Sequence, residues 1–110
     1  MEDPRLGSRQ RLVDAVLDTA GASDPALRRT VEARAAQLGG RSGEAQVPAD
    51  IASYIDKVSR HAYKTTDEDV AALLQAGYSE DAVFEITVSA ALGAGMARLE
   101  RGLAALERAG

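Results

Sequence analysis

Two ionisable side chains of this chain could take part in acid–base chemistry. His61 is the only histidine among the 110 residues, and imidazole is the side chain that most readily exchanges a proton near neutral pH. Glu85 is the only charged residue between Ala82 and Ala97. Burial among apolar neighbours raises the pKa of a carboxyl group into a range that suits proton transfer. If the two side chains converge, they form a credible catalytic pair.

Each of these two residues also has a purely structural interpretation. His61 follows Val58 by three positions near the end of a predicted helix, where the helix dipole favours a half-exposed imidazole. Glu85 lies in the first turns of another predicted helix, where it can meet solvent or pair with Lys57 or Arg60. The sequence leaves both interpretations open.

Four further polar residues could line a pocket with these two: Tyr63, Lys64, Thr65 and Tyr78. They lie at predicted helix boundaries, where such side chains commonly keep their polar ends in water. The neighbouring "TDED" of residues 66–69 has the pattern of a helix capping box, with acids at the positive end of the helix dipole. Most of the charge in this segment is therefore explained by helix initiation.

Several chemistries are excluded by composition. The chain has no cysteine, so it has no disulfide, no thiolate nucleophile and no cysteine-ligated metal. A single histidine leaves too few ligands for a zinc site. The "RSGEAQ" of residues 41–46 lacks the glycine spacing and the lysine of a phosphate-binding loop. We therefore expect no metal and no cofactor.

The overall composition indicates one helical domain. Apolar residues make up 45% of the chain and aromatic residues only 4%, which suits helices packed through Ala, Leu, Val and Ile. The formal net charge is −4 with scattered basic residues, so nucleic acid is not an expected partner. The charged N-terminus is unlike a secretory signal, and no continuous apolar run reaches the roughly 20 residues of a membrane span. We expect a cytoplasmic protein without a membrane segment.

Helical periodicity and capping residues predict an all-α fold of five helices. The spacing predicts that residues 1–8 are a frayed N-terminus and that residues 9–110 form a single helical domain. Ser23 or Asp24 caps the second helix, and Gly39 and Gly40 end it. The five helices should begin near residues 9, 25, 48, 67 and 80.

The last predicted helix is apolar around most of its circumference, which is typical of a central, buried helix. Several of its residues are small enough for another backbone to approach closely: Ala91, Gly93, Ala94, Gly95 and Gly102. Glycine costs about 1 kcal/mol relative to alanine in a helix interior, and close packing within the chain or between subunits would offset that cost. Because a chain of this length can hardly surround such a helix alone, we predict a homo-oligomer.

The segments "VPADIASYIDKVSRHAYKTTDEDVAAL" and "AGYSEDAVFEITVSAALGAGMARLERGLAAL" together resemble the carboxymuconolactone decarboxylase family, within the alkylhydroperoxidase D-like (AhpD-like) fold. The similarity covers roughly residues 48–107, and its most telling element is a helix, then "AGYSED", then a buried Ala/Gly-rich helix. The resemblance implies an all-helical bundle that assembles as trimers or hexamers and takes a small-molecule ligand.

The resemblance also implies which chemistry is absent. Peroxidase members of the family carry a Cys-x-x-Cys pair followed by a histidine, and alignment on Gly77 sets these positions near Ala62, Thr65 and Asp69. None of the three residues matches, so thiol-dependent peroxide reduction is not available. Decarboxylase members work without that pair, which keeps acid–base chemistry on a small carboxylated or lactone-like substrate open.

The sequence leaves open whether the chain is an enzyme. If active, it would be a decarboxylase or lyase that uses His61 and Glu85, with a pocket at a subunit interface. The alternative is a catalytically inactive protein of the same fold that serves as an oligomeric scaffold or binds a partner. A helix-turn-helix is disfavoured, because the helix after Ser79 begins acidic and then becomes apolar, whereas a recognition helix is basic. A small ubiquitin-binding type of bundle would leave the long Ala/Gly-rich helix unexplained.

Overall fold

The computed structural model describes residues 4–109, with side chains from Gly7 onward, and these residues form an all-α fold without strands. The prediction of five α-helices is confirmed. A single 3-10 turn, Ala62–Lys64, extends the third helix. The α-helices are α1 (Pro4–Asp18), α2 (Pro25–Leu38), α3 (Ala49–His61), α4 (Asp67–Gln75) and α5 (Glu80–Ala109).

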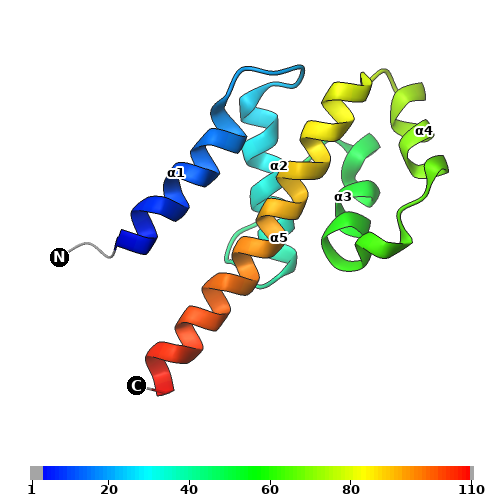
Figure 1. The fold of residues 1–110 in the computed structure, drawn as a ribbon. Helices are drawn as coiled ribbons and strands as arrows, with labels where there is room; N and C mark the ends of the chain where they lie inside the picture. The colour runs from blue at the N-terminus through cyan, green and yellow to red at the C-terminus, as the bar shows by residue number, and fades with distance from the viewer. Residues whose placement is uncertain (1–3, 110) are drawn as a thin grey trace.

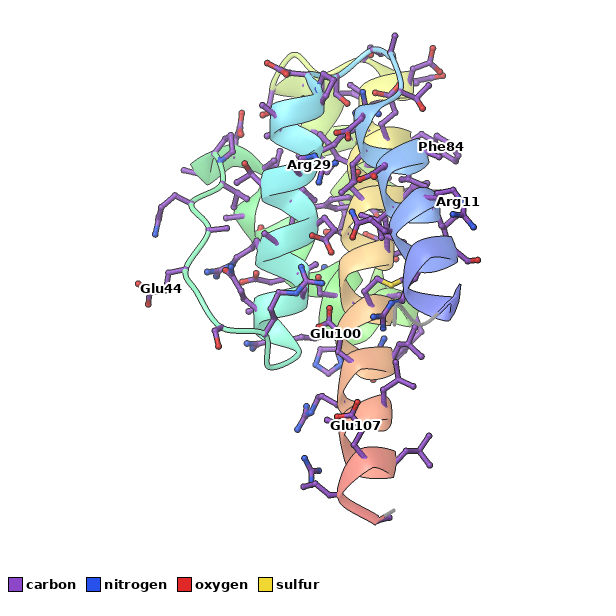
Figure 2. The ribbon with its side chains drawn as sticks, turned by 90° about the vertical axis from the view of Figure 1, so that its left-hand side faces the viewer. Arg11, Arg29, Glu44, Phe84, Glu100 and Glu107 are labelled. Atoms are coloured by element: carbon purple, nitrogen blue, oxygen red, sulfur yellow. The ribbon has the colours of Figure 1, made fainter. Side chains whose placement is uncertain are left out.

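Helix α5 is the central element of the bundle (Figure 1). It packs most extensively against α2 and then against α3, while α1 and α4 contact it more sparingly. The expected central position of the last helix is therefore confirmed. The C-terminal turns of α5 extend past the ends of the other helices (Figures 1 and 2).

The first helix begins earlier than its sequence predicts. Helix α1 starts at Pro4, so the expected frayed N-terminus is wrong for residues 4–8, while residues 1–3 lie outside the described part of the chain. Proline suits the first turn of a helix because its missing N–H group has no intrahelical acceptor there. Farther along α1, Arg11 donates to the hydroxyl group of Ser8 at 3.1 Å and Gln10 donates to Asp14 at 2.9 Å.

Capping residues set the starts of α2 and α4 as predicted. The Asp24 carboxylate accepts a hydrogen bond from the backbone N–H of Ala26 at 2.9 Å. At the start of α4, the Thr66 hydroxyl group accepts from the N–H of Asp69, and the Asp69 carboxylate accepts from the N–H of Thr66 at 2.8 Å. Gly77 follows α4 with a φ of 106°, a backbone conformation that favours glycine.

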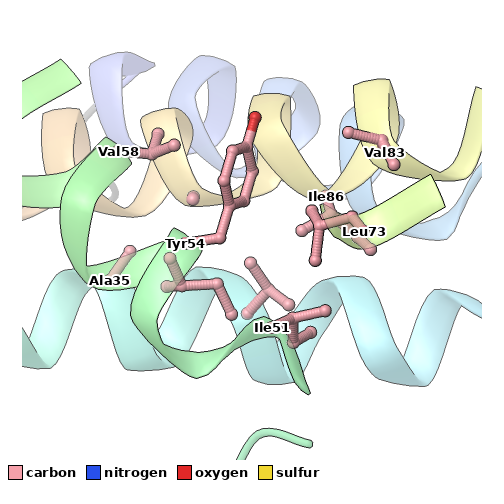
Figure 3. Close-up of a cluster of buried hydrophobic side chains, with 10 residues drawn as sticks. Ala35, Ile51, Tyr54, Val58, Leu73, Val83 and Ile86 are labelled. Carbon is pink, nitrogen blue, oxygen red and sulfur yellow. The ribbon is translucent and has the colours of Figure 1, made fainter. Parts of the chain in front are cut away.

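Helices α2, α3, α4 and α5 enclose one hydrophobic core (Figure 3). The hydroxyl group of Tyr54, at the edge of this core, hydrogen-bonds to the side chain of Thr87 at 2.6 Å. Because all four helices contribute side chains to the same core, the packing of that core fixes their positions relative to one another. The buried core residues are Val31, Ala35, Ile51, Tyr54, Ile55, Val58, Leu73, Val83, Ile86 and Ala90.

One glycine allows α2 and α5 to pack closely. A Cβ atom built on Gly93 would lie 2.2 Å from the backbone oxygen of Glu32 and 3.0 Å from the Cβ atom of Ala35. The predicted role of small residues in close packing within the chain is thereby confirmed at Gly93. At Gly95 and Gly102 the same construction meets no atom within 4 Å, so those two glycines face open space.

Among the described helices, α5 is long and apolar enough to cross a membrane by length and composition. A central helix of a bundle passes the same test, and the other helices bury 44% of the apolar window of α5. No continuous apolar run in the sequence is long enough to span a membrane. Helix α5 meets the criterion because the mean hydropathy of its apolar window is high, although a few polar residues interrupt that window.

Candidate functional site

A cavity of about 330 Å³ lies where the C-terminal ends of α2 and α3 meet the middle of α5. Ser59, Arg60 and His61 reach it from the last turn of α3, and Arg98 and Arg101 reach it from α5. Apolar contacts from Ala35, Leu38, Gly39 and Ala94 form the rest of its wall. This cavity, which we call the His61 pocket, has the volume of a small-ligand site.

The lining of the His61 pocket is cationic. Three arginines, Arg60, Arg98 and Arg101, line it, and no acidic residue does so among the described residues. Arg101 donates a hydrogen bond to the backbone oxygen of Gly39 at 3.0 Å, which holds its guanidinium group at the pocket. Within the described part of the chain, no ion pair joins Arg60 or Arg98 to an acid. The pocket therefore suits an anionic ligand, since guanidinium groups bind carboxylates through paired hydrogen bonds.

His61 lies at the rim of this pocket with its imidazole exposed. Its ring meets the ring of Tyr63 edge-on, with 5.9 Å between the ring centroids. The last turn of α3 ends here, because the backbone leaves the helical conformation at His61 and continues as the 3-10 turn. The exposed position of His61 at a helix end agrees with its structural interpretation. Its place in the lining of a cavity agrees with its interpretation as a catalytic residue.

Glu85 has a structural role at the other end of the bundle. Its carboxylate accepts hydrogen bonds from the backbone N–H of Ala22 at 2.8 Å, from the N–H of Ser23 at 2.7 Å and from the Ser23 hydroxyl group. Led by the Ser23 hydroxyl group, these donors hold the pKa of Glu85 below its usual value. The expected rise of this pKa through burial is therefore wrong, and so is the expected pairing with Lys57 or Arg60.

The structure does not bring His61 and Glu85 together. Ala94 is the α5 residue beside the His61 pocket, and it follows Glu85 by nine residues, which is about 14 Å along a helix axis. Glu85 instead faces the loop that joins α1 and α2. A catalytic pair of these two side chains within one chain is thus contradicted.

The four expected pocket-lining residues lie outside the His61 pocket. Tyr63 is 80% exposed, and Lys64 and Thr65 belong to the same surface turn after α3. Tyr78 lies at the opposite end of α3, where its hydroxyl group donates to Asp50 at 2.9 Å. Burial, together with that hydrogen bond, raises the pKa of Tyr78. Tyr63, Lys64 and Thr65 are close to His61 in the sequence but do not line the cavity, because the chain leaves α3 and forms the 3-10 turn directly after His61.

Sequence reasoning missed the arginines of the pocket. Arg98 and Arg101 are one helical turn apart on α5 and therefore lie on one side of it, but nothing in the sequence connects them with Arg60. Their convergence depends on how α3 packs against α5. The only sequence signal for a basic pocket is the pair of arginines, Arg98 and Arg101, that follows the Ala/Gly-rich segment.

A second cavity, of about 280 Å³, lies between α1, α2 and α5. Its most buried charged residue is Glu32, whose carboxylate accepts two hydrogen bonds of 2.9 Å from Arg41. Arg41 also donates to Glu100 at 2.8 Å and so connects the loop after α2 with both α2 and α5. This arrangement satisfies the charges within the chain, which is typical of a structural ion-pair network.

Within residues 4–109, no cluster of three or more His, Asp or Glu side chains could hold a metal ion. The lining of the His61 pocket offers arginines that can bind an anion and one imidazole that can transfer a proton.

Searches against protein-family models, curated proteins and solved structures found no match to the chain. The resemblance to the carboxymuconolactone decarboxylase family therefore stays a prediction, which rests on the sequence segments quoted for it.

Proposed function

We propose that the chain is a cysteine-free protein of the carboxymuconolactone decarboxylase type, which binds a small carboxylated or lactone-like substrate in the His61 pocket. The observation that carries this proposal is the convergence of three arginines and the only histidine on one cavity that no acidic residue of the described part of the chain lines. Like charges that converge without a counter-charge repel one another, and an anionic ligand relieves this repulsion.

The arginines bind and orient the substrate in this proposal. Arg101, held by its hydrogen bond to Gly39, presents a fixed guanidinium group, and Arg98 lies one turn away on the same helix. Two such groups match the planar oxygens of a carboxylate, which fixes both the position and the direction of the ligand. The apolar wall that includes Leu38 and Ala94 accommodates the carbon skeleton.

His61 supplies the proton transfer. In a decarboxylation, the bond between the substrate carbon and the departing carboxylate breaks, and its electron pair stays on that carbon. The imidazolium form of His61 then donates a proton to the carbon, so a C–H bond replaces the bond to CO₂. A positioned imidazole contributes about 10² to 10⁴ in rate to such a step.

Binding and turnover of carboxymuconolactone by the purified protein test this function. We expect binding by calorimetry and release of CO₂. Arg98→Ala should weaken binding by about tenfold or more, because a charge-assisted hydrogen bond contributes about 1.5 to 3 kcal/mol. His61→Gln should retain most of the binding and lose most of the turnover.

The matched control is Arg108→Ala, which removes an exposed arginine of α5 that does not line the pocket. It should bind and turn over like the parent protein. If carboxymuconolactone does not bind the parent protein, or if Arg108→Ala weakens binding as much as Arg98→Ala, the pocket is not the site.

The second candidate is a catalytically inactive oligomeric protein of the same fold. It is favoured by the exposed apolar side chains along α5, among them Phe84 at 68% and Leu106 at 67% exposure. Under this alternative, the protein self-associates but neither binds nor converts the small carboxylates.

A further inference from the structure

The cavity of about 280 Å³ between α1, α2 and α5 is lined by charges of both signs. Figure 2 faces the side of the bundle on which these three helices meet. Arg9 lines the cavity from α1, Glu32 lines it from α2 and Glu100 lines it from α5. Val13 and Met96 add an apolar part to the wall. We call this cavity the Arg9 pocket, and among the described residues it shares no lining residue with the His61 pocket.

The guanidinium group of Arg9 has a donor that the chain does not use. Its Nη1 atom is buried and has no hydrogen-bond partner within residues 4–109. The other buried side-chain atoms of this kind among those residues belong to Arg28, Arg34 and Asp56, which line neither the Arg9 pocket nor the His61 pocket. A buried donor without an acceptor costs free energy, and an oxygen atom of a bound molecule would recover it.

The remaining charges around the Arg9 pocket already have partners. Arg29 and Arg41 each donate hydrogen bonds to two carboxylates. Together with Arg9, three arginines thus meet four carboxylates, those of Asp14, Asp18, Glu32 and Glu100. A ligand with a net negative charge would add to this surplus, although Arg9 needs an oxygen acceptor. A zwitterion meets both conditions, because its carboxylate binds a guanidinium group while its net charge stays zero.

Glu100 is the acceptor that remains for the cationic end of a zwitterion. Its Oε1 atom accepts from Arg41 at 2.8 Å, whereas its Oε2 atom lies 3.5 Å from Nε of the same arginine, a weak contact. Its side chain is 41% exposed, so a ligand can reach it. Glu32 is less accessible, because both of its oxygen atoms accept from Arg41 at 2.9 Å and only 9% of its side chain is exposed.

We propose that the Arg9 pocket binds a free α-amino acid with an apolar side chain. The carboxylate of the ligand accepts from Nη1 of Arg9, its ammonium group donates to Glu100, and its side chain lies against Val13 and Met96. Water alone would satisfy Arg9, but it leaves the apolar part of the wall hydrated, and displacement of that water favours the amino acid. A cavity of about 280 Å³ suits a ligand of this small size.

Binding of the ligand should also fix the first turns of α1. Leu17 is the only buried side chain of α1 among the described residues, so the turns before it lie over the pocket rather than on the hydrophobic core. A ligand that binds both Arg9 and Glu100 joins these turns to α5. Amide hydrogen exchange in residues 8–16 should therefore slow on binding. The inference concerns the Arg9 pocket alone and does not depend on turnover in the His61 pocket.

Calorimetric titration of the full chain with L-leucine tests the pocket. We expect saturable binding of one L-leucine per chain, together with slower amide exchange in α1. Two analogues separate the two charges, since 4-methylpentanoate lacks the ammonium group and 3-methylbutylamine lacks the carboxylate. Each analogue should bind about tenfold more weakly than L-leucine or worse, because it leaves Glu100 or Arg9 without a partner.

Two pairs of variants assign the binding to the named side chains. Arg9→Gln should weaken L-leucine binding by about tenfold or more, whereas Arg11→Gln, an exposed change on the same helix outside the lining, should leave it unchanged. Glu100→Gln should weaken binding similarly and keeps an oxygen acceptor for Arg41. Its control is Glu107→Gln, which changes an exposed residue farther along α5 that does not line the pocket (Figure 2).

The inference is overturned if L-leucine shows no saturable binding in the millimolar range, or if 4-methylpentanoate binds as well as L-leucine. It is also overturned if Arg98→Ala weakens L-leucine binding and Arg9→Gln does not, because the ligand would then occupy the His61 pocket. Faster or unchanged amide exchange in α1 with L-leucine bound would likewise contradict the placement of the ligand under this helix.

Discussion

The carboxylate of Glu85 accepts hydrogen bonds from the backbone N–H and the hydroxyl group of Ser23, and thereby joins α5 to the loop between α1 and α2. Arg28, in the first turn of α2, has its Nε atom 4.0 Å from Glu85. Arg28 also donates to the backbone oxygen of Val16, in the last turn of α1, at 2.8 Å and to that of Thr19, directly after the helix. Glu85 is thus a packing residue.

Glu85→Gln is therefore expected to weaken the fold and leave ligand binding unchanged. Loss of the charge-assisted hydrogen bonds to Ala22 and Ser23 should lower the free energy of unfolding by about 2 kcal/mol at neutral pH. Urea unfolding followed by circular dichroism measures the change. A variant as stable as the parent protein would show that the hydrogen bonds to the loop contribute little.

The pH dependence of this effect has a definite sign. The pKa of Glu85 is lowered in the folded protein, so its contribution is fully present above the unfolded value of about 4.3. It is lost as the pH falls through the lower folded pKa. The stability difference between the parent protein and Glu85→Gln should therefore be constant above about pH 5 and shrink below about pH 4. A difference that grows on acidification would contradict this assignment.

Gly93→Ala should destabilise the contact between α2 and α5. The new methyl group would lie 2.2 Å from the backbone oxygen of Glu32, and a backbone atom in a helix has little room to move. We expect a loss of at least about 2 kcal/mol in thermal or urea unfolding. Gly7→Ala is the matched control, because its methyl group would meet only the flexible end of Arg11 at 3.5 Å. Equal effects of the two changes would argue against close helix packing.

Arg41→Ala should leave Glu32 as an unpaired carboxylate, with only 9% of its side chain exposed. A loss of about 2 to 4 kcal/mol in the free energy of unfolding follows from the cost of burying an unpaired charge. The double variant Glu32→Gln/Arg41→Ala should recover part of this loss, since a neutral amide is easier to leave buried than a carboxylate. A double-mutant cycle measures the coupling, and additive effects would exclude it.

Asp69→Ala should increase the fraying of α4. The pKa of Asp69 is lowered first by the side chain of Lys57 and then by the backbone N–H of Thr66, which shows that both stabilise the ionised form. Loss of the carboxylate should speed amide hydrogen exchange in α4 relative to α2. Glu68→Ala, an exposed acid in the same turn, should leave the exchange rates nearly unchanged. Similar rates in the two variants would contradict the role of the capping box.

The candidate site could be predicted only in part from the sequence. His61 was identifiable by its chemistry, because no other histidine competes with it. Arg98 and Arg101 were not, since scattered basic residues normally belong to solvated helix faces. Glu85 stands out in the sequence as an isolated charge, but its partner Ser23 lies 62 residues away, and no local spacing relates the two.

The sequence by itself determined the five helices and the starts of α2 and α4, because the 3.6-residue period and the caps at Asp24 and Thr66 act between residues that are near in the chain. The tertiary structure decided where the charges lie. The packing of α5 against α2 at Gly93 and against α3 assigns Glu85 to the α1–α2 loop and Arg98 to the His61 pocket. These contacts depend on the angles at which the helices cross. Side-chain volumes and close packing fix those angles only when all of the helices are in place.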